Sequence, residues 1–130
     1  MARIFTLDEA NALLPRLSEI IGEMQAKQPA LARLREALAA MDRTASGNGH
    51  LVGKELRDKR QQAEAISGQL DELLAEVTSF GCELKGLDQG LIDFPAEREG
   101  RTVYLCWRLG EDTITHWHDI EAGFAGRQQL

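Results

Sequence analysis

Apolar residues recur at alternating spacings of three and four over residues 7–41, which keeps one stripe on one side of a helix. Thr6 followed by Glu9 has the spacing of a capping box, and it stands where the apolar series begins. Pro15 removes one hydrogen bond inside this pattern. We therefore expect either a kink there or a short first helix with Pro15 in the first turn of its successor. The helical stretch is predicted to end near Arg43.

A stricter repeat follows. Its members advance by four and three and are apolar except for Lys59; they are Val52, Leu56, Lys59, Ala63, Ile66, Leu70, Leu73, Val77 and Phe80. Such a stripe is typical of a coiled coil. Residues 44–50 are rich in Gly and Asn and predict a loop between the two stretches, and Gly81 suits a helix C-cap. The sequence predicts a coiled-coil-like antiparallel helical hairpin over residues 6–80.

Two helices alone cannot enclose stripes of this length, because each helix keeps one side open to water. Either the C-terminal segment or a second subunit must cover the open side. A homodimer that forms a four-helix arrangement is the simplest solution, and we expect it.

The periodicity changes to two in residues 81–130. Three stretches rich in β-branched and aromatic residues, 91–95, 101–109 and 113–120, are separated by turn residues and predict three short antiparallel strands. Residues 123–127 fit an ordered loop or a flexible tail. The expected fold is α+β: one domain, residues 1–130, with a helical hairpin (6–80) followed by a small three-stranded β-rich segment (81–130).

The composition excludes several classes of protein. The net charge is −6, and such a field repels a phosphate backbone, so we expect no nucleic-acid partner. No stretch is apolar enough for a membrane span, and the N-terminus lacks the apolar core of a signal peptide. The two cysteines, Cys82 and Cys106, are too few for a disulfide scaffold. We therefore expect a cytoplasmic protein with free thiols.

His116 and His118 are the strongest candidates for chemistry. They lie two residues apart on a predicted strand, so both imidazoles project from one face, a spacing that many sites for divalent metals use. Residues with N, S or O donors that could complete such a site are Cys106, Asp119, Glu121, Glu83 and Asp93.

The strand register provides a test of this site. A type II′ turn favours Gly at its first central position, which selects a two-residue loop at Gly110-Glu111. That register places both histidines on the face of Val103, Leu105 and Trp107 and turns Cys106 to the other side, so it excludes a Cys-His-His site. A loop of odd length, or a bulge, would instead bring Cys106 beside His116.

The simpler interpretations are structural. The histidines then serve as hydrogen-bonded groups on a half-buried face, Trp107 and Trp117 cover the helices, and Cys106 is a small buried hydrophobe. Phosphate-loop, dinucleotide-binding, zinc-protease and nucleophile-elbow motifs are all missing from the sequence, and so is a C-x-x-C pair. No residue is therefore assigned a catalytic role.

Several strings resemble a known bacterial family, domain of unknown function 2203. They are residues 5–15 at the N-terminus, and Gly81 to Lys85, Gly90 to Pro95, Leu105 to Glu111, Trp117-His118 and Gly123 to Arg127. The resemblance covers nearly the whole chain and implies no particular activity, because that family has no assigned function. The resembling motifs include His118, as part of a Trp-His element, but they do not include His116. Ligand-binding candidates at or near these motif positions are Glu83, Asp93, Trp107 and Arg127.

Two hypotheses follow. The first is a non-enzymatic oligomeric interaction or scaffold module, supported by the heptad stripe, with its protein partner unidentified. The alternative is a metal-binding or small-ligand-binding protein, or an enzyme, with its site near His118 in the β-rich segment.

Overall fold

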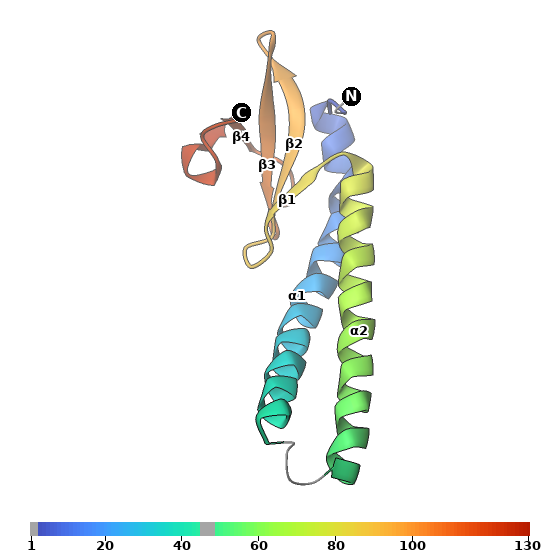
Figure 1. The fold of residues 1–130 in the computed structure, drawn as a ribbon. Coiled ribbons are helices and arrows are strands. Elements are labelled where there is room, and N and C mark those ends of the chain that lie inside the picture. The colour runs from blue at the N-terminus through green and yellow to red at the C-terminus, as the bar shows by residue number, and fades with distance from the viewer. Residues whose placement is uncertain (1–2, 45–48) are drawn as a thin grey trace. The chain divides into compact units, whose positions relative to one another are not determined.

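A computed structural model describes residues 3–44 and 49–130 and shows two helices followed by a five-stranded sheet (Figure 1). The helices are α1 (Leu7–Thr44) and α2 (Gly49–Phe80). The strands are β1 (Glu83–Gly86), β2 (Leu91–Arg98), β3 (Arg101–Arg108), β4 (His116–Asp119) and β5 (Gln128–Gln129), and a short 3-10 helix, η2 (Phe124–Gly126), precedes β5. The predicted α+β fold is confirmed. Both flanks of the predicted 44–50 loop are helical, and the remainder, residues 45–48, lies outside the described residues.

The predicted capping box is present at the start of α1. The Thr6 backbone N–H donates to Glu9 Oε1 at 2.8 Å, and the Glu9 N–H donates to Thr6 Oγ1 at 3.1 Å. Helix α1 then continues through Pro15 to Thr44 as one element, so a separate short first helix does not form. As far as they are described, neither α1 nor α2 contains a segment that could cross a membrane.

The chain forms two compact units, one of residues 1–23 and 74–130 and the other of residues 24–73. The helices run antiparallel within each unit. In the first unit, Arg16 on α1 is paired with Glu76 on α2 at 2.6 Å. In the second, Asp42 and Arg60 approach to 3.8 Å. The predicted helical hairpin is therefore confirmed, while the organisation of residues 1–130 as a single domain stays a prediction.

The sheet is an antiparallel meander in the order β1-β2-β3-β4-β5. It has two more strands than the sequence predicted. The two edge strands were missed because they are short and carry little apolar pattern: β5 consists of two exposed glutamines, and β1 is half-buried on one face only. The β2–β3 turn lies at Glu99-Gly100, where both residues have positive φ (52° and 79°), as a two-residue type I′ hairpin requires.

The apolar face of the sheet forms the core of the first unit together with the beginning of α1. Phe5 packs edge-on against Phe94 with ring centroids 5.2 Å apart, and the Asn11 side chain accepts a hydrogen bond from the Ile114 N–H. The buried residues on this face are Ile92, Phe94, Ala96, Val103, Leu105, Trp107 and Trp117. This packing leaves the opposite face of the sheet to carry the polar side chains.

The predicted register between β3 and β4 is wrong. Cys106 pairs with His116 and Tyr104 pairs with His118, so the histidines share a face with Cys106 and lie opposite Val103, Leu105 and Trp107. The reason is the position of Gly110. A turn closed by a hydrogen bond from the Glu111 N–H to the Arg108 carbonyl places Gly110, with φ 104°, at the second central position instead of the first. Residues 109–115 then form a connection of odd length.

Candidate metal centre

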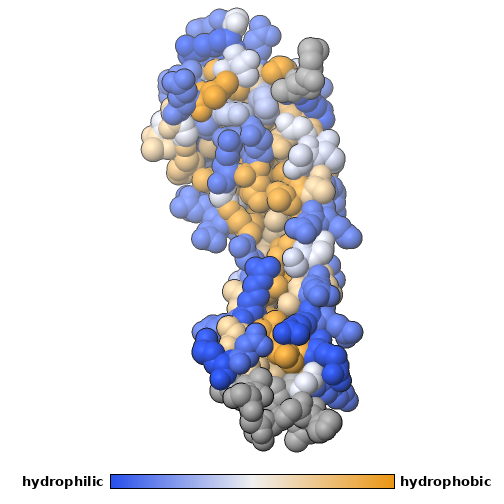
Figure 2. Space-filling view, in the orientation of Figure 1, coloured by the Kyte–Doolittle hydropathy of each residue, from blue (hydrophilic) through white to orange (hydrophobic). Residues whose placement is uncertain are grey.

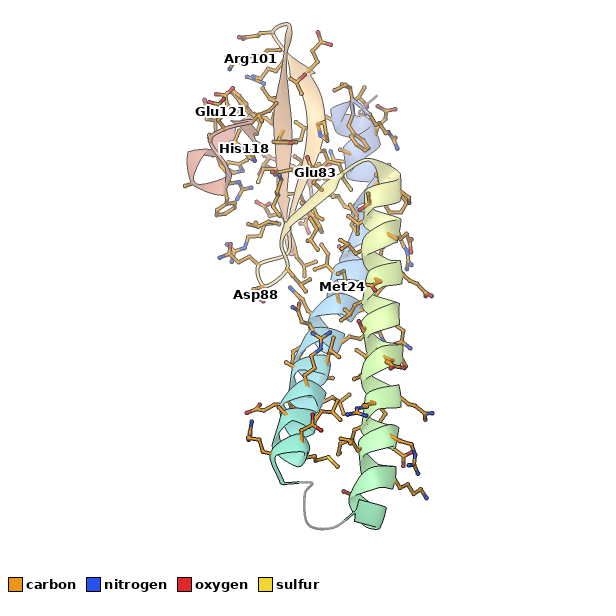
Figure 3. The ribbon with its side chains drawn as sticks, viewed as in Figure 1. Met24, Glu83, Asp88, Arg101, His118 and Glu121 are labelled. Atoms are coloured by element: carbon orange, nitrogen blue, oxygen red, sulfur yellow. The ribbon has the colours of Figure 1, made fainter. Side chains whose placement is uncertain are left out.

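A row of polar residues crosses the face of the sheet that is turned away from the apolar core. The register pairs Glu83 with Asp93, Asp93 with Cys106, and Cys106 with His116. His118 lies one pleat further along β4, on the same face (labelled in Figure 3). Three adjacent central strands therefore contribute one donor each, an oxygen from β2, a sulfur from β3 and a nitrogen from β4.

His118 is the best-oriented side chain of this group. It is 1% exposed, and its Nε2 lies 3.0 Å from Asp93 Oδ1 while its Nδ1 lies 2.8 Å from the carbonyl oxygen of Asp119. A carbonyl oxygen only accepts hydrogen bonds, so Nδ1 must carry a proton and donate it. Nε2 is consequently the nitrogen that faces Asp93 and that is available to a ligand.

Asp93 is the only buried carboxylate among the described residues. Burial raises the pKa of this carboxyl group above its usual value, and hydrogen bonds from His118 and from the Cys106 thiol counteract part of the increase. Such a carboxylate depends on its neighbours, because an ionised oxygen in a dry site is costly unless a cation or several donors face it.

Cys106 completes the group. The ligand atoms of Asp93, Cys106 and His118 all lie within 4.8 Å of one another, and all three side chains are buried. Burial, together with the nearby charge of Asp93, raises the pKa of the Cys106 thiol to about 12, and the positive charge of Arg127 acts in the opposite direction. At neutral pH and without a cation, this residue is a thiol that donates its hydrogen to Asp93.

The donor set fits a borderline divalent metal. Carboxylate, imidazole and thiolate are the three ligand types that Zn²⁺ takes, and tetrahedral bonds of the usual lengths place donor atoms about 3.3–3.6 Å apart. The Nε2–Oδ1 distance of 3.0 Å is close to this separation, and the sulfur atom, within 4.8 Å of the other two donors, needs to come closer by no more than about 1.5 Å. The Nδ1–H bond from His118 to a backbone carbonyl is also the outer contact that orients metal-binding histidines.

The same geometry does not suit a Cys-His nucleophile pair. The Cys106 thiol is hydrogen-bonded to Asp93 and not to His118, so the imidazole is not placed to take its proton. The raised thiol pKa points in the same direction, since reactive cysteines have lowered values.

A small cavity adjoins the three residues. Its volume is about 120 Å³, and the other lining residues include Lys85, Tyr104, Ile120 and Phe124. It has room for a few water molecules or one small ligand. Three protein ligands leave one position of a tetrahedral ion for such a ligand.

Glu83 and Arg127, two of the predicted candidates, lie next to the centre but are not part of it. Glu83 is exposed, pairs with Lys85 at 3.5 Å, and accepts a hydrogen bond from Tyr104, which raises the pKa of Tyr104 to about 12. Arg127 donates to both carboxylate oxygens of Glu111 at 3.0 and 3.1 Å. Both residues therefore supply charge near the donor atoms.

Trp107 and His116 are placed elsewhere. Trp107 lies on the core face and donates its indole N–H to the Glu111 carbonyl at 2.9 Å, so it does not face the donor group. His116 shares the polar face, but its Nδ1 is 2.8 Å from the Thr115 hydroxyl, and the three-residue group does not include it. Cys82 is buried at the end of α2, where its thiol donates to the Val77 carbonyl.

The register favoured from the sequence excluded Cys106 from a site with the histidines, and the structure has instead the alternative, a connection of odd length that places Cys106 beside His116. The available signal was Asp93, a lone carboxylate inside the apolar run of residues 91–96. A buried carboxylate needs a partner on the neighbouring strands, and the observed register supplies His118 on this face in addition to Cys106.

Comparison with known proteins places the chain in a family without adding an activity. No curated protein and no solved structure matches it. The pattern of one family, described as uncharacterized conserved protein (DUF2203), matches residues 3–130, which is essentially the whole chain. This is the family that the sequence motifs resemble. The chain belongs to the uncharacterized conserved protein family DUF2203.

Proposed function

We propose that this protein binds a divalent metal ion of the zinc type through Asp93, Cys106 and His118. The observation that supports the proposal most is the convergence of three buried donors of different chemistry, from three adjacent strands, within 4.8 Å. The Nδ1–H contact of His118 and the adjacent cavity are consistent with a site that keeps one position for a further ligand.

Titration with Co²⁺ tests the proposal, because Co²⁺ replaces Zn²⁺ in tetrahedral sites and absorbs strongly in the near ultraviolet when a thiolate binds it. We expect one equivalent of Co²⁺ per tag-free chain to produce this absorption, and Zn²⁺ to displace it. Cys106→Ser should abolish the thiolate band, and Asp93→Asn should weaken binding.

His116→Ala is the matched control, since His116 lies two residues before His118 on the same strand but outside the donor group. It should bind Co²⁺ as the unchanged protein does. Absence of a thiolate band in the unchanged protein, or its loss in His116→Ala with retention in Cys106→Ser, would contradict the proposed ligands.

We further propose a homodimer formed by residues 24–73. Among the residues of this unit whose burial is described, few apolar ones are fully buried, and the stripe of α2 is only half-covered at Leu56, Ile66 and Leu70. In the space-filling view, apolar residues are visible between rows of hydrophilic ones along the helices (Figure 2). A second copy that packs its own stripe there would remove this surface from water.

Sedimentation velocity tests the dimer. The unchanged chain should sediment as a dimer at micromolar concentration, and Leu70→Glu should shift it to a monomer. Gln69→Glu adds the same charge at an exposed neighbouring position and should leave the dimer intact. A monomeric unchanged chain at high micromolar concentration would refute the proposal.

We also propose that the protein has no nucleic-acid partner and is located in the cytoplasm. The net charge of −6 disfavours nucleic acid as a partner. Both cysteines are buried free thiols, which suits a reducing compartment such as the cytoplasm.

A further inference from the structure

A second cavity in the first unit is separate from the proposed metal centre. It has a volume of about 380 Å³ and lies on the core side of the sheet, beside β2 and the residues that precede α1. Its interior is mainly apolar, with Val103, Leu105 and Trp117 among the lining residues, and none of the three proposed metal ligands takes part. Small-molecule sites have volumes in this range and linings of this kind.

The rim of this cavity gathers exposed apolar side chains. The described part of the chain has five large apolar residues that are exposed, and three of them, Ile4, Leu7 and Leu130, line the cavity. Single exposed apolar residues are ordinary, but a cluster around a hollow indicates a binding surface.

Arg98 places a positive charge at this cavity. Its guanidinium carbon lies 4.6 Å from the centre of the Trp117 ring, and within residues 3–44 and 49–130 it forms no ion pair or hydrogen bond. Alternation along β2 sends the Glu97 side chain to the opposite face, so Glu97 contributes mainly its backbone. The unpaired guanidinium is therefore available to an anion held in the cavity.

The edge of β2 supplies a second donor. β1 pairs only with residues 91–93, and the Pro95 carbonyl accepts a hydrogen bond from the Phe5 N–H at 2.7 Å. Antiparallel alternation directs the N–H and C=O of Glu97 to this same edge. One residue of free edge is too short to pair an added peptide strand, but its N–H and the Arg98 guanidinium can together hold a carboxylate.

We propose that this cavity binds a small, mainly apolar carboxylic acid, with its apolar body against Trp117 and its carboxylate at Arg98. The site is independent of the proposed metal centre. The apolar interior contributes affinity through burial, whereas the cation and the edge N–H select an acid over a neutral molecule of the same shape.

The test compares 4-phenylbutyrate with the matched alcohol 4-phenylbutanol, by NMR of the full isotope-labelled chain. Both should shift the methyl signals of Val103 and Leu105 and the indole signal of Trp117. The acid should bind about tenfold more tightly, the usual gain from a hydrogen bond to a charged group, and this preference should decrease with added salt.

Arg98→Gln should abolish the preference for the acid, and Arg98→Lys should retain part of it. Arg101→Gln is the control, because Arg101 faces the same Trp117 ring at 5.8 Å but is paired with Asp119 and does not line the cavity (labelled in Figure 3). Leu7→Ser should weaken both compounds, and Leu74→Ser, at a similarly exposed residue away from the cavity, should weaken neither (40% and 43% exposed).

Equal affinities for the acid and the alcohol, or an Arg98→Gln protein that keeps the preference, would overturn the proposed ligand class. Absence of NMR shifts at Trp117 with both compounds would overturn the site. Shifts that appear only when an extended peptide is added, and with neither small compound, would also overturn it. The Co²⁺ titration of the metal centre is unaffected by any of these results.

Discussion

Two variants of Asp93, Asp93→Asn and Asp93→Leu, have side chains of similar size but differ in whether they can form hydrogen bonds. Their stabilities without metal therefore measure the structural role of Asp93 apart from its role as a metal ligand. Asp93 is 4% exposed and lies 3.0 Å from Nε2 of His118. Nδ1 of His118 donates to the Asp119 carbonyl, so Nε2 is the ring nitrogen that faces Asp93. In Asp93→Asn the side-chain amide can still form a hydrogen bond with Nε2, because it offers both an accepting oxygen and a donating nitrogen. In Asp93→Leu nothing can.

The expected magnitudes follow from this difference. Asp93→Asn keeps a neutral hydrogen bond and should change the free energy of unfolding by less than about 1 kcal/mol. Asp93→Leu leaves Nε2 of His118 and the Cys106 thiol without their partner in a buried site, which costs about 1–3 kcal/mol. With the urea dependence usual for small proteins, its unfolding midpoint should fall by about 1 M.

Urea unfolding followed by circular dichroism, in the presence of a chelator, measures these changes on the metal-free chain. Glu97→Leu is the control, since Glu97 is an exposed acidic residue of the same strand and its replacement should cost less than about 0.5 kcal/mol. The reasoning is refuted if Asp93→Leu is as stable as Asp93→Asn, because Asp93 would then not be a partner on which His118 depends.

Three further predictions concern stability. Gly90→Ala should destabilise the fold by about 2 kcal/mol or more, because φ is +68° and a Cβ would lie 2.5 Å from Leu109 Cβ. Gly100→Ala, also at positive φ but in open space, should cost about 1 kcal/mol. Thermal unfolding of the two variants measures the difference. Burial raises the pKa of the Cys82 thiol from 9.0 to about 11, so the folded state holds this proton more tightly than the unfolded state does. Between pH 9 and 11 the free energy of unfolding should therefore decrease by about 1–3 kcal/mol more in the unchanged chain than in Cys82→Ala. Urea unfolding at each pH measures this difference. Thr6→Ala removes the capping hydroxyl and should cost about 1 kcal/mol in the same assay, while an unchanged midpoint would show that the cap does not matter.

The helical part of the fold was predictable because its signals are local. The Thr6–Glu9 capping box and the heptad from Val52 to Phe80 depend only on spacing along one helix, and the helices form as those spacings require. The edge strands β1 and β5 were not predictable in this way. Their few residues show no apolar alternation, and they exist because β2 and β4 offer them hydrogen-bonding edges.

The candidate site depended on one turn. His118 and Asp93 were identified from residue type and position, but their convergence with Cys106 requires the β3–β4 register. Gly110 can supply a positive φ at either central position of a turn, and the two choices place the histidines of β4 either on the face of Cys106 or on the opposite face. Contacts distant in sequence, such as the hydrogen bond from Ile114 to Asn11, accompany the longer connection that is observed.

X-ray absorption spectroscopy of the Zn²⁺-loaded chain tests the central claim most directly, because it reports the atoms bound to the metal. We expect one sulfur at about 2.3 Å from the zinc, contributed by Cys106, with nitrogen and oxygen neighbours at about 2.0–2.2 Å. The sulfur should disappear in Cys106→Ser and remain in His116→Ala. A zinc shell of nitrogen and oxygen alone in the unchanged protein would contradict the account.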